Sequence, residues 1–133
     1  MLRDLKTKHA FEVAIDIQAI SSDTTTDGNI IDLQGKSGAV FAIHSGVLTD
    51  GAYVPLLEES DVITFGGEET AVADADMIGT EALASFTLSE DGVVKTLGYI
   101  GEKRFVRLAL VSSSTSTGGT IGADVITLLD QTA

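Results

Sequence analysis

Residues 104–129 read RFVRLALVSSSTSTGGTIGADVITLL, two apolar runs separated by a polar segment that contains glycine. Alternate side chains from Val106 to Leu110 occupy one face of an extended chain, and those from Phe105 to Ala109 occupy the other. This pattern predicts a central strand at 104–111 and a flexible loop at 112–119. Residues 120–129 are apolar on both faces, which is typical of an inner strand or of a strand covered by a partner.

Further strands are predicted on the N-terminal side of this stretch. Residues 12–20, EVAIDIQAI, alternate with the period of a half-buried strand. We expect Val13, Ile15, Ile17 and Ala19 to face a core, and Glu12, Asp16 and Gln18 to face water. Other apolar runs predict strands at 29–33, 39–45, 53–60, 86–88 and 93–100, and the region near 75–79 predicts one helical turn.

Two turns that contain glycine predict hairpins. Asp50-Gly51 lies between the runs at 39–45 and 53–60, and Glu90-Asp91-Gly92 lies between those at 86–88 and 93–100. Because Gly adopts positive φ without strain and Asp tolerates it, we expect the strands that flank each turn to pair. Pro55 has no N–H to donate, so the strand at 53–60 is expected at a sheet edge or with a bulge.

Together these features predict an all-β fold. About eight short strands, with no long segment of helical period, favour a single-domain β-sandwich or jelly-roll-like barrel. We place this domain at residues 10–133 and an N-terminal arm at residues 1–9. A chain of 133 residues is long enough to bury a core without a metal or a disulfide.

The charge and composition exclude several classes of partner. Twenty Asp and Glu against eight Lys and Arg give a net charge of -12 and a pI near 4.2, so the bulk surface would repel nucleic acid. The chain has no Cys for disulfides or thiolate zinc sites. It also has neither the apolar run of roughly 18 residues that a membrane helix needs nor a secretory signal in residues 1–12. We expect it to bind neither nucleic acid nor membranes.

The titratable side chains show no catalytic pattern. His9 and His44 are the only imidazoles, and His44 is expected to face solvent from a strand. Glu58 and Glu59 are adjacent, so on a strand they point to opposite faces; with Asp61 they predict a solvated acidic edge rather than a glycosidase pair. We therefore expect a non-enzymatic protein without a cofactor.

Asp74, Asp76 and Glu81 are the candidates for a cation site. Calcium binds several oxygen ligands, but the EF-hand pattern fails because Ile78 occupies a ligand position. Asp residues at turns more often accept hydrogen bonds from backbone N–H groups. A calcium- or glycan-binding β-sandwich stays open as an alternative.

Basic residues are distributed unevenly. Between Lys36 and Lys95 the chain has eleven acidic residues and no Lys or Arg, whereas the arm holds Arg3, Lys6 and Lys8. These three are the first candidates for an interface. Arg104 and Arg107 are further candidates, and we expect one of them to form an ion pair with the acidic surface.

Three segments carry a resemblance to a known family. They are LLEESD at 56–61, VADADMIGT at 72–80 and LGYIGEKRFVRLAL at 97–110. In this order the chain resembles, from about residue 30 to 129, small structural proteins of tailed bacteriophages encoded near the major capsid protein. The stretch at 98–107, GYIGEKRFVR, is similar to the GYVGxKRYVR of that family. After LEESD, relatives tend to continue into Gly and Trp, whereas here the chain continues as VITFGG.

The resemblance implies a β-sandwich that decorates or cements a capsid by bridging subunits of the major capsid protein, as a trimer. Such a protein would be made in the host cytoplasm and would lie on the outer surface of the virion, because an acidic protein is repelled by packaged DNA. The arm would then contact a neighbouring subunit or the capsid. An alternative position is the head-tail connector or the tail.

Overall fold

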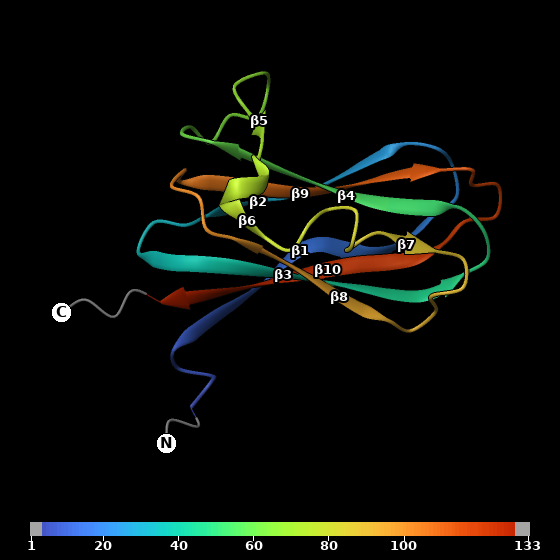
Figure 1. Ribbon diagram of the computed structural model, residues 1–133, viewed down its shortest axis with the longest axis horizontal. Helices are drawn as coiled ribbons and strands as arrows, with labels where there is room; N and C mark the ends of the chain where they lie inside the picture. The colour runs from blue at the N-terminus through green and yellow to red at the C-terminus, as the bar shows by residue number, and fades with distance from the viewer. Residues whose placement is uncertain (1–3, 130–133) are drawn as a thin grey trace.

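The computed structural model describes residues 4–129 as two antiparallel sheets packed face to face, shown as a lower and an upper layer in Figure 1. Sheet A has the order β1-β10-β3-β8-β6, formed by β1 (His9–Ile20), β10 (Gly119–Leu129), β3 (Lys36–Leu48), β8 (Val94–Tyr99) and β6 (Met77–Ile78). Sheet B has the order β2-β9-β4-β5, formed by β2 (Thr25–Asp32), β9 (Phe105–Ser113), β4 (Ala52–Ser60) and β5 (Thr70–Ala71), and β7 (Phe86–Thr87) also pairs with β4.

The predicted all-β sandwich is confirmed. Two strands of two residues each, β5 and β6, add to the eight predicted ones, and both lie between the strands predicted at 53–60 and 86–88. The helical turn predicted near 75–79 is a 3-10 turn, η1 (Asp74–Asp76). The core between the sheets is built from side chains of both layers, and its largest fully buried members are Tyr53, Tyr99, Phe41 and Phe86.

Both apolar runs of the stretch at 104–129 form inner strands, as predicted. β9 lies between β2 and β4, and β10 lies between β1 and β3. Val106, Leu108 and Leu110 are fully buried and face the core. Each sheet is therefore organised around one strand from this stretch, and the loop between the two strands carries the chain from sheet B to sheet A.

Both predicted hairpins are wrong. The turn at Asp50-Gly51 joins β3 in sheet A to β4 in sheet B, and the turn at 90–92 joins β7 in sheet B to β8 in sheet A. Gly51 and Gly92 adopt the positive φ that the turns require, at 92° and 63°. The Asp50 carboxylate accepts hydrogen bonds from the loop that precedes β10, including one of 2.8 Å from the N–H of Gly118. The chain at this turn is thus tied to another crossover and does not close a hairpin.

The alternation predicted for β1 is wrong in part. Ala14 and Ile15 are both buried, whereas Val13, Ile17 and Ala19 are exposed. The register of β1 against β10 shifts between Val13 and Ile15 and again between Ile15 and Gln18. Because an extra residue at a bulge reverses the facing of the residues that follow, the apolar side chains of β1 are divided between the core and the outer face.

The edge position or bulge predicted from Pro55 is wrong, because β4 lies between β9 and β5 in sheet B and pairs with β9 in continuous register. β4 pairs with β9 along its length, but on the other side the described pairs are with β7 at 52–53 and with β5 at 58–59. Between them the N–H of Leu57 donates to Glu81 Oε2 at 2.7 Å rather than to a strand. No strand faces the missing N–H of Pro55 among the pairs that the structure describes.

The described part of the arm, residues 4–8, precedes β1. The Asp4 carboxylate accepts the N–H groups of Lys6 and Thr7, and the His9 imidazole bonds to the Leu5 carbonyl at 2.8 Å. Lys6 and Lys8 are exposed. Arg3 lies outside the described residues.

Candidate functional site

The segment that carries the family resemblance crosses from β8 in sheet A to β9 in sheet B. The buried hydroxyl of Tyr99 donates to Glu59 Oε1 at 2.8 Å and accepts the N–H of Lys103 at 3.1 Å. Burial and the bond to Glu59 both raise the pKa of Tyr99. A side chain at Gly101 would collide with the Tyr99 ring. The motif therefore joins the two sheets at one end of the sandwich.

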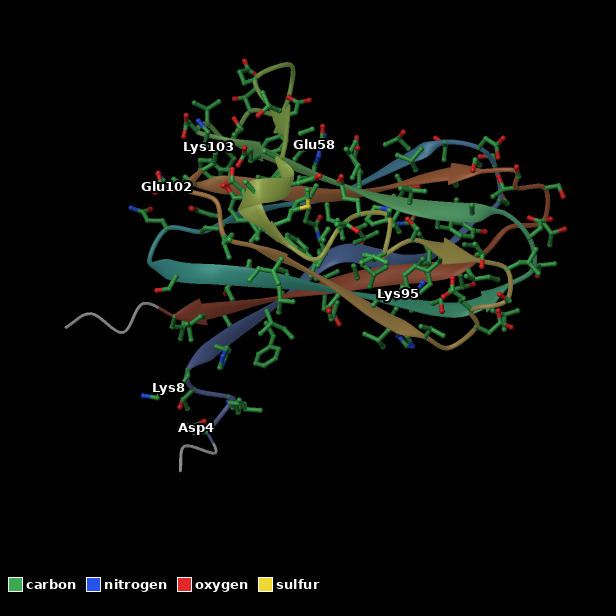
Figure 2. The ribbon with its side chains drawn as sticks, in the orientation of Figure 1. Asp4, Lys8, Glu58, Lys95, Glu102 and Lys103 are labelled. Atoms are coloured by element: carbon green, nitrogen blue, oxygen red, sulfur yellow. The ribbon has the colours of Figure 1, made fainter. Side chains whose placement is uncertain are left out.

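Its cationic side chains bind carboxylates of the same chain. Lys103 Nζ lies 2.8 Å from Asp61 Oδ2, and Figure 2 shows Lys103 and Glu102 at the upper left end of the sandwich. Arg104 donates to both carboxylate oxygens of Asp32, at 3.0 and 2.9 Å. These hydrogen bonds, with one from the N–H of Gln34, lower the pKa of Asp32 to about 2. This bidentate pair is half exposed, with 48% of the Arg104 side chain accessible.

Arg107 lies in a more enclosed cluster on the outer side of sheet B. Its Nη2 is 2.8 Å from Glu58 Oε1 and 3.7 Å from Asp27 Oδ1, and it reaches Glu69 at 4.0 Å. The guanidinium group lies 4.8 Å from the centre of the Phe65 ring. Only 13% of the Arg107 side chain and 15% of that of Glu58 are exposed. Arg107 Nε is buried and has no hydrogen-bond partner among residues 4–129.

These contacts place the predicted interface residues in two groups. The ion pair expected for Arg104 or Arg107 is present for both, and both are held by carboxylates of their own chain. Lys6 and Lys8 form no ion pair within residues 4–129 and lie exposed in the arm. An interface role for these residues stays a prediction. Within residues 4–129 the charges of Lys6 and Lys8 are not paired with a carboxylate, so they are more accessible to a partner than those of Arg104 and Arg107.

The structure does not assemble a cation site from the acidic candidates. Within residues 4–129 no three His, Asp or Glu side chains are grouped to hold a metal ion. Glu81 accepts the N–H of Leu57, and Asp74 and Asp76 lie in the 3-10 turn. The calcium alternative thus lacks its ligand geometry.

His44 is exposed and the two adjacent glutamates face opposite ways, as predicted, but the predicted solvated acidic edge is wrong for both glutamates, because Glu59 is buried and only 15% of the Glu58 side chain is exposed. Glu58 points outward to Arg107, whereas Glu59 points inward to Tyr99, so they lie on opposite faces of β4. Asp61 is exposed and pairs with Lys103. His44 is exposed on β3.

Sequence reasoning missed an uncovered apolar surface on the outer side of sheet A. Residues paired across antiparallel strands share a face, so one row contains Phe11, Ile126, Val40 and Gly98, and the next contains Val13, Asp124, Ala42 and Thr96. A third row pairs Gly122, His44 and Val94. We call this surface the sheet A face, defined by Phe11, Val13, Val40, Val94, Ile126 and Leu128.

The sheet A face is open to solvent. Phe11 is 59% exposed and Val94 is 58% exposed, and Val13 and Leu128 are also exposed. Figure 1 shows no other described element below the strands of sheet A, apart from the start of the chain at the lower left. A hollow of about 250 Å³ lies where β1 bulges over Gly122, beside His44 and Asp124. The signal in the sequence was the run at 120–129, which is apolar on both faces as in a partner-covered strand.

Residues 4–129 contain no helix that is long and apolar enough to cross a membrane. No family model matches the chain, and no curated protein matches it. Among solved structures, the chain is similar to one from the structure of infectious bursal disease virus, Gx strain, with a TM-score of 0.50 and 14% identity. The match covers 94% of this chain and 34% of the virus chain, so this chain spans about a third of that protein's length.

Two further matches superpose less closely. The crystal structure of PirA gives a TM-score of 0.37 at 9% identity and covers 96% of this chain and 99% of that one. The xylan-binding domain from CBM 22 gives 0.40 at 8% identity and covers 98% and 92%. Neither of these bears on function. The likeness to the virus chain shows that this protein has a β-sandwich fold that also occurs in a virus structure.

Proposed function

We propose that this chain is a non-enzymatic structural protein of a virion, which decorates the outer surface of a tailed-phage capsid and stabilises it by bridging subunits of the major capsid protein. The observation that carries the proposal is the sheet A face. A monomeric soluble domain rarely leaves a contiguous apolar surface across four strands uncovered, and such a surface marks a contact site. This points to a protein that acts by assembly.

Three further observations support this role. The GYIGEKRFVR stretch resembles the phage family, and its residues form the crossover that joins the sheets. The match to a chain of a virus structure covers 94% of this chain. A net charge of -12 favours the outer surface, because packaged DNA would repel the protein from the inner one.

The exposed lysines of the arm are the proposed contact with the capsid. Lys6 and Lys8 precede β1, and Figure 2 shows Lys8 beyond the end of sheet A. Exposed positive side chains steer an acidic protein toward an acidic capsid surface. Lys8→Glu is expected to weaken capsid binding by about tenfold or more. Lys103→Glu, an equal charge change at a lysine already paired with Asp61, is the matched control and should leave capsid binding nearly unchanged.

The decisive experiment compares virions with and without this protein. Capsids that lack it should release DNA at a lower temperature, and adding back the purified protein should restore the release temperature. An equal release temperature for both would contradict the stabilising role. Copy number separates the positions in the virion, since decoration needs on the order of hundreds of copies and a connector about a dozen.

A further inference from the structure

The sheet A face differs from the rest of the molecule in charge. In the three rows formed by β1, β10, β3 and β8, Asp124 is the only carboxylate and His44 the only imidazole, and the bulge of β1 adds the exposed Asp16 beside them. The remaining side chains of these rows are Phe, Val, Ile, Ala and Thr, or the hydrogen of Gly. Two copies that each carry a charge of -12 repel one another wherever their acidic surfaces meet. They can approach closely on this face without opposing many like charges.

We propose that the sheet A face packs against the same face of a second copy of this chain, related by a two-fold axis. A two-fold contact is isologous: if a residue of one copy contacts a second residue of the other copy, the same contact occurs with the two copies exchanged. Asp124 and His44 are exposed on neighbouring strands, and a carboxylate accepts the hydrogen bond that an imidazole N–H donates. In the pair, each Asp124 is placed to meet the His44 of the other copy, and the apolar rows cover one another.

The size of the face suits a reversible contact. Four strands about 4.8 Å apart, with roughly five to seven residues of each on the face at about 3.3 Å per residue, give a footprint of roughly 300–450 Å². A stable interface takes about 800 Å² of accessible surface from each partner, so we expect the pair to dissociate on dilution. Phe11, exposed on the face, supplies the kind of aromatic anchor that contributes most to binding energy.

The pairing also gives a route to bridging, and in this respect it rests on the proposed function. Each chain carries one arm that begins beside the sheet A face, at the lower left in Figure 2. If the two-fold axis lies between the two faces and runs across the strands, it directs the two arms to opposite ends of the pair. Each pair would then contact two capsid subunits, and a dimer takes the place of the trimer that the family resemblance implies.

The test uses the purified chain and needs no virion. Light scattering after size-exclusion chromatography, over a range of protein concentrations, should give a mass of twice 13.8 kDa. Val94→Glu places a carboxylate on the face of both copies and is expected to weaken pairing by about 100-fold. Ile63→Glu adds the same charge to an apolar side chain of similar exposure, 63%, off the face, and should leave pairing unchanged.

A second pair of variants does not depend on how well a strand tolerates Val94→Glu. His44→Asp changes an exposed side chain and opposes two carboxylates, so it should weaken pairing by at least tenfold. Adding Asp124→His should restore a pair of one carboxylate and one imidazole between the copies and recover most of the affinity of pairing. Circular dichroism and thermal unfolding confirm that each variant is folded.

The outcomes separate this inference from the proposed function. A monomer at the highest concentrations, a trimer, or equal weakening by Val94→Glu and Ile63→Glu would each overturn the two-fold pairing. A monomer that still coats and stabilises capsids would overturn the pairing alone. A dimer that neither binds nor stabilises capsids would support the pairing and contradict the proposed function.

Discussion

Arg107 is surrounded by more negative charge than it can neutralise. Glu58, Asp27 and Glu69 lie within 4.0 Å of its guanidinium group, and the Phe65 ring covers it. Arg107 and Glu58 are mostly buried, so water solvates either charge only weakly when its partner is removed. Removing one partner from an enclosed pair leaves an uncompensated charge, which costs more free energy than the intact pair contributes. The residue therefore holds the β4–β5 loop against sheet B.

Replacement of this arginine is expected to be the costlier of two matched changes. Arg107→Met should lower the free energy of unfolding by about 2–4 kcal/mol, because the enclosed Glu58 loses its partner. Arg104→Met should change it much less, since the Arg104–Asp32 pair is half exposed and solvent screens it. Thermal and urea unfolding of both variants measures the difference. Glu58→Gln combined with Arg107→Met should recover part of the loss, and equal destabilisation by the two single variants would contradict this account.

At the scale of the elements, local signals predicted the strands and their turns but not their pairing. Asp50-Gly51 and Glu90-Asp91-Gly92 have the chemistry of tight turns, and the glycines adopt the expected φ. That chemistry is the same whether the next strand pairs with the previous one or crosses to the other sheet. The choice depends on distant partners, such as the loop before β10 that binds Asp50. The inner positions of β9 and β10 were predictable because apolar side chains occupy both faces of each stretch, which is the sequence pattern of an inner strand.

The candidate site was predictable only in part for the same reason. The charges of the arm and the motif at 98–107 can be read from the chain. The sheet A face depends on which strands become neighbours and on the two bulges of β1, which expose Val13 and Ile17. A single bulge exchanges the core-facing and surface-facing side chains that follow it, and the alternation of residues 12–20 does not predict where a bulge occurs.

The contact between β2 and β1 gives a prediction for an element. A side chain at Gly28 would collide with the backbone oxygens of Ala14 on β1 and Leu108 on β9. Gly28→Ala should therefore destabilise the fold by about 2–4 kcal/mol, because backbone on both sides must move. Gly38→Ala on β3 is the control, since the nearest atom is the Tyr99 carbonyl oxygen at 3.9 Å. Urea midpoints that fall equally for both would show that Gly28 is not constrained by packing.

At the scale of the whole molecule, two electrostatic effects oppose each other in acid. Mutual repulsion of the carboxylates weakens as pH falls from 7 toward the pI of 4.2, which favours the compact state. Other carboxylates are stabilised as anions in the folded chain. The N–H groups of Thr117, Gly118 and Ser116 hold the pKa of Asp50 well below its usual value, and hydrogen bonds from Arg104 lower the pKa of Asp32 from 3.8 to about 2.

These lowered pKa values set the direction of the pH dependence. A carboxyl whose pKa is lower in the folded state binds fewer protons there than in the unfolded state. Its stabilisation is complete above the unfolded pKa and disappears as pH falls through the folded one, here from about 4 toward 2. We expect the melting temperature to hold or rise slightly from pH 7 to about 5, where repulsion is relieved, and to fall steeply below about 4.

Asp50→Asn tests which carboxylates cause the acid loss. The amide keeps the shape of the side chain but offers one acceptor oxygen and no charge to the three N–H groups of the loop before β10. The variant should melt below the parent at pH 7, and the two melting temperatures should converge as pH approaches 2, because the parent then loses the same anion. Calorimetry of both chains between pH 2 and 7 measures this. A difference in melting temperature that stays constant over the whole range would mean that the Asp50 charge does not contribute to stability. The loss of stability in acid would then arise from other carboxylates.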